Sequence, residues 1–443
     1  MCAYSEESSA IVHFESDSAS STVKKTGDQI EHGITPRAFA FACCNALISQ
    51  AISTPYIFTT AGWVCFIAQA VTSGLTLVSS ELLRIVLQNE QVRSYGDAKD
   101  IPSFEREYTF LAEYCGGRVC RNFILVVILL QYLASIATIV GAIGVCGTLI
   151  APAMSANIWI IIFSLLLILA IAIPWLKQVT IVMGALGVFG TIGTLGSWVG
   201  TSFAILPDSH LVENIPPREP VAAHIIAAIS LSVWSCGDLP SLTPYIGCVK
   251  GTTNRRISLI LATCQVISLF YIYIMGVAGM QICDGLCSDF YPASLTSGIG
   301  PNRVRLCLAY SLYIFILIRM FSMAQVKMVA VMVATEKAIS QILVLSLSKE
   351  VLAASNAWRL ALRVILVAIV AVAAALVKHE LAYFQAVTSS LLTTCLLYLC
   401  PIWFYYRVTG PHGTKLYMIY VSIALTSTFM IVATYVSVMG ILD

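Results

Sequence analysis

Long apolar stretches separated by short polar segments make up most of the chain from residue 38 onward. A helix needs about 20 predominantly apolar residues to cross the hydrocarbon core of a bilayer, and stretches near that length recur along the sequence. Eleven of them predict membrane-spanning helices, near residues 38–60, 63–87, 122–149, 157–176, 179–205, 221–246, 257–281, 304–332, 362–377, 382–405 and 416–440. The ninth is short, so we expect a tilted or partly shielded helix there.

The composition excludes several classes of soluble protein. Only 11% of the 443 residues are charged and 58% are hydrophobic, whereas soluble domains carry about 25% charged residues. So few charges cannot cover the surface of a soluble protein of this size, which argues against a soluble enzyme and against a nucleic-acid partner. The sequence has no G-x-x-x-x-G-K-[ST] loop and no histidine in the middle of an apolar stretch. We therefore expect neither an ATP-driven pump nor an intramembrane enzyme, and no cofactor or metal.

The basic residues predict the orientation of the chain. With the amino terminus in the cytosol, 19 Lys and Arg residues fall on the cytosolic side and four on the other side. Cytosolic loops carry an excess of Lys and Arg, so this distribution favours eleven spans, with a cytosolic amino terminus and Asp443 outside. We expect the membrane to be the plasma membrane or an internal membrane of the vacuolar or lysosomal type. In an outside loop, Cys283 and Cys287 either pair or remain free thiols.

The chain divides at the ends of the predicted spans. The polar, serine-rich amino-terminal segment is typical of a disordered tail. The expected parts are a cytosolic tail (1–37), a first group of five spans (38–205), an extracytosolic loop (206–220), a second group of five spans (221–405), and the eleventh span with the carboxyl terminus (406–443).

Two of the predicted spans contain signals for an interrupted helix. In the first, Thr54 is a suitable N-cap and Pro55 suits the first helical position, so residues 49–53 are expected to be unwound. In the sixth, Gly237 relaxes the backbone before Asp238, which can cap a second half-helix. A kink absorbed by neighbouring helices is the alternative at either position alone.

The two interruptions together indicate an inverted repeat. They lie in the first and sixth of eleven spans. Because five spans cross the membrane an odd number of times, the second group of five begins on the side opposite to the first group. We therefore expect an all-α membrane protein of the LeuT-like class, with a five-plus-five inverted repeat and broken first and sixth helices. Such breaks expose backbone amides and carbonyls that bind substrates and ions.

Four segments of the chain resemble the amino acid/auxin permease family. The residues from Asn45 to Trp63, which end in TPYIFTTAGW, are similar to its first-helix signature, N…G-x-G-x-L-x-x-P-Y-A-F…A-G-W. The other similar segments are Glu105–Cys120, Val233–Lys250 followed by Arg255-Arg256, and Gly276–Met280. The chain departs from the family at Ile48 and Gln50, which stand where the signature has glycines.

The resemblance implies a secondary active transporter that moves amino acids by alternating access. The carboxylate of the substrate would meet the amino ends of half-helices in the first span, and its ammonium would meet the sixth span. The expected substrate-binding residues are Asn45, Ser49, Gln50, Ala51, Ile52, Ser53, Tyr132, Trp234, Ser235, Cys236, Gly237, Asp238 and Ser322.

Three charged residues within the spans are candidates for ion coupling. A charge at the bilayer centre costs about 2.5–3.5 kcal/mol on insertion scales and usually has a role. Asp238 either caps a half-helix or accepts a proton or a substrate amine. Arg319 and Lys327 lie near Ser322, where the resemblance implies a sodium site. A basic residue there can replace the cation, which predicts a proton-coupled or sodium-independent transporter; pairing with lipid phosphates or loop acids is the alternative.

Two other functions fit the same spans. The missing glycine pair favours an amino-acid sensor or scaffold with little transport, and a channel for a small solute is a further alternative. In the fifth span, glycines recur every third residue from Gly184 to Gly196. Successive steps of three residues rotate around a helix, so we expect close packing on several sides.

Overall fold

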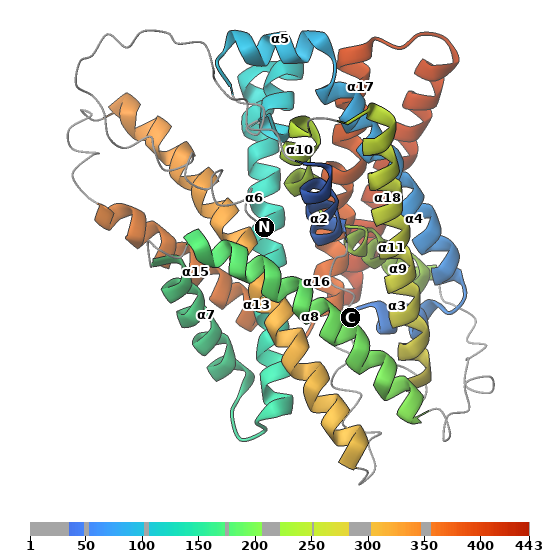
Figure 1. The fold of residues 1–443 in the computed structure, drawn as a ribbon, viewed down its shortest axis with the longest axis vertical. Helices are drawn as coiled ribbons and strands as arrows, with labels where there is room; N and C mark the ends of the chain where they lie inside the picture. The colour runs from blue at the N-terminus through green and yellow to red at the C-terminus, as the bar shows by residue number, and fades with distance from the viewer. Residues whose placement is uncertain are drawn as a thin grey trace.

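The protein is a bundle of helices in the computed structural model (Figure 1), which describes residues 35–47, 53–101, 106–172, 177–205, 222–249, 252–282, 303–346 and 356–442. The first half comprises α2 (Pro36–Leu47), α3 (Thr54–Ala61), α4 (Val64–Leu87), α5 (Glu90–Ala98), α6 (Tyr108–Ile150), α7 (Ala156–Ala172) and α8 (Lys177–Ile205). The rest comprises α9 (Ala222–Ser235), α10 (Leu239–Cys248), α11 (Asn254–Ile282), α13 (Arg303–Ser346), α15 (Asn356–Val377), α16 (Leu381–Thr388), η6 (Ser389–Thr393), η7 (Cys395–Leu399), α17 (Cys400–Thr409) and α18 (Thr414–Leu442).

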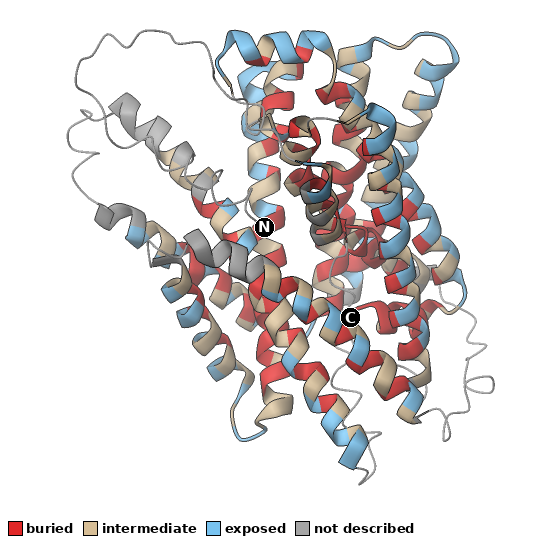
Figure 2. Ribbon diagram, viewed as in Figure 1, coloured by how far each residue is buried: buried red, intermediate tan, exposed pale blue. Residues whose placement is uncertain are grey.

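Each of the eleven predicted spans coincides with one helix or with consecutive helical segments. Eight segments of the described chain are long and apolar enough to cross a membrane, and α9 with α10 counts as one of them. The α2–α3 pair, α7 and α8 account for the other three predicted spans. In Figure 2, buried residues gather inside the bundle, while many large apolar side chains are exposed on its outside. Such an exposed apolar surface is expected where helices face lipid.

The third span begins earlier than its apolar stretch predicts. Helix α6 starts at Tyr108, within a polar segment, and its backbone bends at Gly117, whose φ is 73°. The first turn is held because the Tyr108 hydroxyl donates to the Leu396 carbonyl at 2.8 Å. The Arg407 guanidinium also donates to the Cys115 carbonyl before the bend, at 3.1 Å. Contacts with the tenth span thus stabilise the helical conformation of this polar segment. Such contacts cannot be predicted from hydropathy alone.

The tenth span is one nearly continuous helix with two wide turns. The segments η6 and η7 have π-helical hydrogen bonding between α16 and α17. Such turns are rare and often mark functional sites. Buried hydroxyl groups line this region, and Ser389 donates to the Ser230 carbonyl on α9 at 2.5 Å.

The glycines of the fifth span pack against one neighbouring helix. A Cβ added at Gly190 would lie 2.9 Å from the backbone nitrogen of Arg319, and one at Gly193 would lie 2.2 Å from the Phe315 ring. A Cβ at Gly187 would lie 2.8 Å from the Ser322 hydroxyl. The prediction of packing on several sides is therefore wrong for these three glycines. They all face α13 and allow α8 to approach that helix closely.

Candidate functional site

The interruptions of the first and sixth spans meet inside the bundle. Helix α2 ends at Leu47 and α3 begins at Thr54, while α9 ends at Ser235 and α10 begins at Leu239. The backbone amide of Asp238 donates to the Ala46 carbonyl at 3.1 Å, so the sixth-span break satisfies a carbonyl at the end of α2. The predicted break of the sixth span is therefore present as an interrupted helix. In the first span, residues 48–52 between α2 and α3 lie outside the described residues.

Gly237 allows this contact because it has no side chain. Its φ is 108°, a conformation that favours glycine, and a Cβ there would lie 2.9 Å from the Ala46 carbonyl oxygen. The Ser268 hydroxyl of α11 donates to the Leu47 carbonyl at 2.8 Å. Two carbonyls in the last described turn of α2 thus accept hydrogen bonds from different spans.

Asp238 faces a lysine of the eighth span. Its carboxylate Oδ2 lies 4.0 Å from Nζ of Lys327. The Lys327 ammonium donates to the Ser135 hydroxyl of α6 at 2.7 Å. It also lies 5.9 Å and 6.0 Å from the centres of the Tyr132 and Trp234 rings, within the range of a cation–π contact. We call these five residues the central charged cluster.

The second carboxylate oxygen of Asp238 is buried. Oδ1 makes no well-aligned hydrogen bond within the described part of the chain, but the Tyr132 hydroxyl and the Ser241 backbone amide lie close enough to interact with the carboxylate. The carboxylate is at the N-cap position of α10 but makes no capping hydrogen bond. A buried acceptor without a partner is costly, so this oxygen is suited to accept a proton or a donor from a bound molecule.

Three other predicted site residues make contacts outside the central charged cluster. The Ser235 hydroxyl donates to the Gln69 side-chain oxygen at 3.1 Å. The Gln69 amide in turn lies 3.5 Å from the Cys236 sulfur. Ser53 donates to the Gln385 side chain on α16. These contacts join the broken helices to the second and tenth spans, as side-chain hydrogen bonds between membrane helices commonly do.

Arg319 and Ser322 face the fifth span. A Cβ at Gly187 would lie 3.0 Å from a guanidinium nitrogen of Arg319, so this side chain fits over the glycines of α8. Tyr271 of α11 interacts electrostatically with the same guanidinium. Lys327 lies about two turns further along α13 and reaches the break at Asp238. Of the two basic residues, Lys327 is therefore the one that joins the central charged cluster.

Several predicted positions fall where side chains are not described. Ser49, Gln50, Ala51 and Ile52 lie outside the described residues, as does the loop with Cys283 and Cys287. Asn45 belongs to α2, and only its backbone is described.

Sequence reasoning missed two polar residues near the breaks. Ser135 binds the Lys327 ammonium, and Gln265 on α11 has both amide atoms buried without a partner among the described residues. Each lies one turn from a residue that contacts the site, Ser135 from Tyr132 and Gln265 from Ser268. Polar residues at this spacing within apolar helices could have indicated Ser135 and Gln265 as candidates for the site.

Comparison with known proteins identifies the fold. No family model matches the chain, and no curated protein matches it. It resembles the structure described as the inward-facing conformation of Mhp1, with a TM-score of 0.55 and 12% identity over 92% of this chain and 89% of that chain. The manganese transporter of Eremococcus coleocola, solved with an aromatic bis-isothiourea substituted compound, has a TM-score of 0.45 and 13% identity, over 96% and 97% of the two chains. The likeness to Mhp1 confirms the LeuT-like fold predicted from the breaks.

Proposed function

We propose that the protein is a secondary transporter that moves amino acids by alternating access and is similar to the amino acid/auxin permeases. The observation that carries the proposal is the meeting of two broken helices beside an ion pair, Asp238 with Lys327. Broken helices at corresponding positions of two repeats bind substrates and ions near the bilayer midplane in this fold. The parts 38–205 and 221–405 would be the two repeats.

The site suits a small zwitterion. The buried Oδ1 of Asp238 is an acceptor for a substrate ammonium, and the Trp234 and Tyr132 rings lie near the Lys327 ammonium that faces the same carboxylate. The amino end of α3, directly after residues 49–53, offers unpaired amides and a positive dipole to a carboxylate. Ser53 and the neighbouring predicted residues of the first span would position that carboxylate.

Lys327 supports coupling without sodium. Its ammonium lies between Asp238 and Ser135, and supplies the positive charge that a bound cation would otherwise bring. A carboxylate next to a lysine can exchange a proton as the substrate binds, since each group's protonation depends on the other's charge. We therefore propose proton coupling or facilitated exchange in place of sodium coupling.

Uptake by the purified protein in liposomes tests this proposal. Twenty amino acids are offered at two pH values, once in sodium and once with choline replacing sodium. We expect saturable uptake of a subset of amino acids that persists in choline and changes with pH. Complete loss of uptake in choline would refute sodium independence, and uptake that does not saturate would indicate a channel.

The same experiment addresses a second function, that of an amino-acid sensor or scaffold. Ile48 and Gln50 favour it, because they bring side chains to positions where the related signature leaves the backbone open. A sensor binds amino acids but need not move them. Binding by the purified protein without uptake into liposomes would therefore select the sensor.

A further inference from the structure

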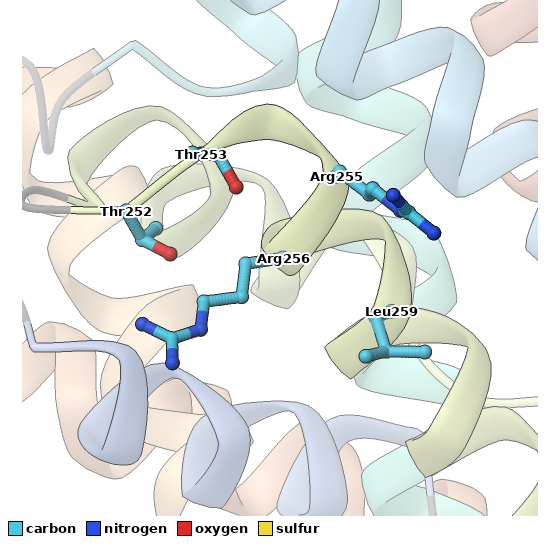
Figure 3. Close-up of a pocket in the computed structure, with 5 residues that line it drawn as sticks. All are labelled: Thr252, Thr253, Arg255, Arg256 and Leu259. Carbon is cyan, nitrogen blue, oxygen red and sulfur yellow. The ribbon is translucent and has the colours of Figure 1, made fainter.

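The surface hollow at the start of α11 and the centre of the bundle differ in how their polar groups lie. The hollow has a volume of about 570 Å³ and is lined by Thr252, Thr253, Arg255, Arg256 and Leu259. Figure 3 shows the side chains of Arg255 and Arg256 on opposite sides of the first turn of the helix, so they do not converge on one ligand. Polar groups do converge on the Lys327 ammonium, which Ser135 and Asp238 approach from two other spans.

A buried glutamine adjoins the central charged cluster. Gln131 directly precedes Tyr132 on α6, and only 5% of the residue is exposed. Its amide nitrogen lies 3.5 Å from the Thr393 hydroxyl of the tenth span. Its amide oxygen is buried and has no hydrogen-bond partner among the described residues. Because an unpaired buried acceptor is costly, a donor that reaches this oxygen would be bound favourably.

Helix geometry places Gln131 next to the residue that holds the Lys327 ammonium. Gln131 lies one turn before Ser135 on α6, at a spacing that brings Cβ atoms to about 5–6 Å from each other. Helical side chains lean toward the amino end of their helix, so the Ser135 side chain leans toward Gln131. The Lys327 ammonium donates to the Ser135 hydroxyl at 2.7 Å. The Gln131 amide is therefore within reach of the lysine side chain, which is long and flexible.

The Lys327 ammonium has spare donors. An ammonium carries three N–H groups, and Ser135 accepts the one hydrogen bond that the described residues make with it. The Asp238 oxygen, 4.0 Å away, is beyond the about 2.7–2.9 Å of a charge-assisted hydrogen bond. Lys327 and Asp238 thus attract each other without a direct hydrogen bond, and the ammonium can leave the carboxylate while Ser135 still holds it.

Binding of a substrate ammonium would change the partner of Lys327. This step rests on the proposed function, in which Asp238 accepts the ammonium of an amino acid. Two positive charges beside one carboxylate repel each other in a buried site, where solvent screens them little. We propose that Gln131 is a positioning residue that receives the Lys327 ammonium when a substrate binds to Asp238. In the occupied site, the ammonium then lies between Ser135 and Gln131.

Substrate binding by a Gln131 variant tests the proposal. The probe is the amino acid, among the twenty, that the unmodified full-length protein takes up fastest into liposomes. Gln131→Leu removes the acceptor, so we expect at least about tenfold weaker binding, the effect of one lost hydrogen bond to a charged group. The melting temperature of the empty variant should not fall, since an unpaired buried acceptor is removed. A merely structural glutamine would lower the melting temperature and leave binding unchanged.

A second substitution, Gln131→Glu, should separate affinity from turnover. Its carboxylate attracts the Lys327 ammonium in the empty site as well, which keeps Asp238 open to the substrate. We expect binding at least as tight as that of the unmodified protein. Uptake at saturating substrate should be several-fold slower, because Lys327 does not return to Asp238. Weaker binding together with unchanged maximal uptake would contradict the proposed exchange of partners.

A matched control is Gln325→Leu. Gln325 is also buried and has an unpaired amide oxygen within the described part of the chain, but it lies two residues before Lys327 and so on roughly the opposite side of α13. Its substrate binding should stay within about twofold of that of the unmodified protein. Equal weakening by both leucine variants, or unchanged binding by Gln131→Leu, would overturn the role of Gln131 and leave the proposed function intact. Absence of amino-acid binding by the unmodified protein would refute both.

Discussion

Asp238 occupies the N-cap position of α10, but its side chain makes no hydrogen bond to the first turn of that helix. One carboxylate oxygen instead lies 4.0 Å from the Lys327 ammonium, and the other is buried without a partner among the described residues. In a capping role, the carboxylate would accept hydrogen bonds from the backbone amides of the first turn of α10. The approach of Lys327 supports the proposed functional role of Asp238, while the Ser241 backbone amide also lies near the carboxylate, as it would for a helix cap.

At this residue, we predict that Asp238→Asn impairs substrate affinity or its dependence on pH while expression and folding persist. The amide keeps the shape of the side chain but cannot carry the negative charge that attracts an ammonium or a proton. The expected loss is at least tenfold in uptake at limiting substrate, measured in liposomes at two pH values. Unchanged uptake with an unchanged pH profile would exclude a functional role for Asp238.

Two further variants distinguish the effect of losing the Asp238 charge from a general loss of stability. Asp100→Asn removes an exposed carboxylate outside the cluster and should leave uptake unchanged. Lys327→Met should lower the melting temperature, because it leaves the Asp238 charge without its ion partner. Adding Asp238→Asn to Lys327→Met should then restore part of that stability, since the unpaired charge is gone.

At the scale of helices, glycines determine how closely the fifth span approaches the eighth. Gly187, Gly190 and Gly193 all face α13. Small residues allow such close approach between membrane helices, where van der Waals packing drives association. The approach also places α8 against Arg319, which shields part of that guanidinium from lipid. Close packing of these two helices is thus a property of a few positions rather than of the whole glycine-rich segment.

For this packing, we predict that alanine in place of glycine lowers the stability of the protein at one position of α8 and does not lower it at another. Gly190→Ala should destabilise the protein by about 1–3 kcal/mol, the usual cost of overpacking, because the new Cβ would meet the Arg319 backbone. Gly196→Ala should be neutral or slightly stabilising, since nothing lies within 4 Å and alanine is the better helix former. Melting temperatures of the purified variants measure both. Equal effects would show that α8 does not pack against α13 through Gly190.

At the scale of the whole molecule, the proposed alternating access would require one part of the bundle to move relative to another. Helices α2 and α11 lie side by side, and the sulfurs of Cys44 and Cys264 are 3.6 Å apart across them. Helix α2 also carries the Ala46 carbonyl, which accepts a hydrogen bond from Asp238 in the break of the sixth span. Movement of α2 along α11 would therefore change the geometry of the site directly.

We predict that oxidation of this cysteine pair blocks transport. A membrane-permeant oxidant should cross-link Cys44 and Cys264 and reduce uptake several-fold, and a reducing agent should restore it. Cys264→Ser should make uptake insensitive to the oxidant. Full uptake by the cross-linked protein would instead show that α2 and α11 move as one body. Peptide mapping verifies that the bond has formed.

Much of the fold could be predicted because its signals are local in the chain. The eleven spans follow from the lengths of apolar stretches, and the two breaks follow from Pro55, Gly237 and their capping neighbours. The early start of α6 was not predictable in this way, because Tyr108 and Cys115 depend on hydrogen bonds with the tenth span. Hydropathy reports the preference of a segment for lipid, and it does not report such contacts.

The sequence by itself predicted eleven spans, and it determined the class of fold and the position of the break in the sixth span, because each depends on backbone preferences and hydrophobicity within a short segment. It also singled out Asp238, Arg319 and Lys327, since charges are rare in apolar stretches. Only the tertiary structure decided that Lys327 reaches Asp238, that Arg319 lies over the glycines of α8, and that Ser135 completes the central charged cluster. The physical reason is that these contacts join residues on different helices, and the packing of the whole bundle sets their distances.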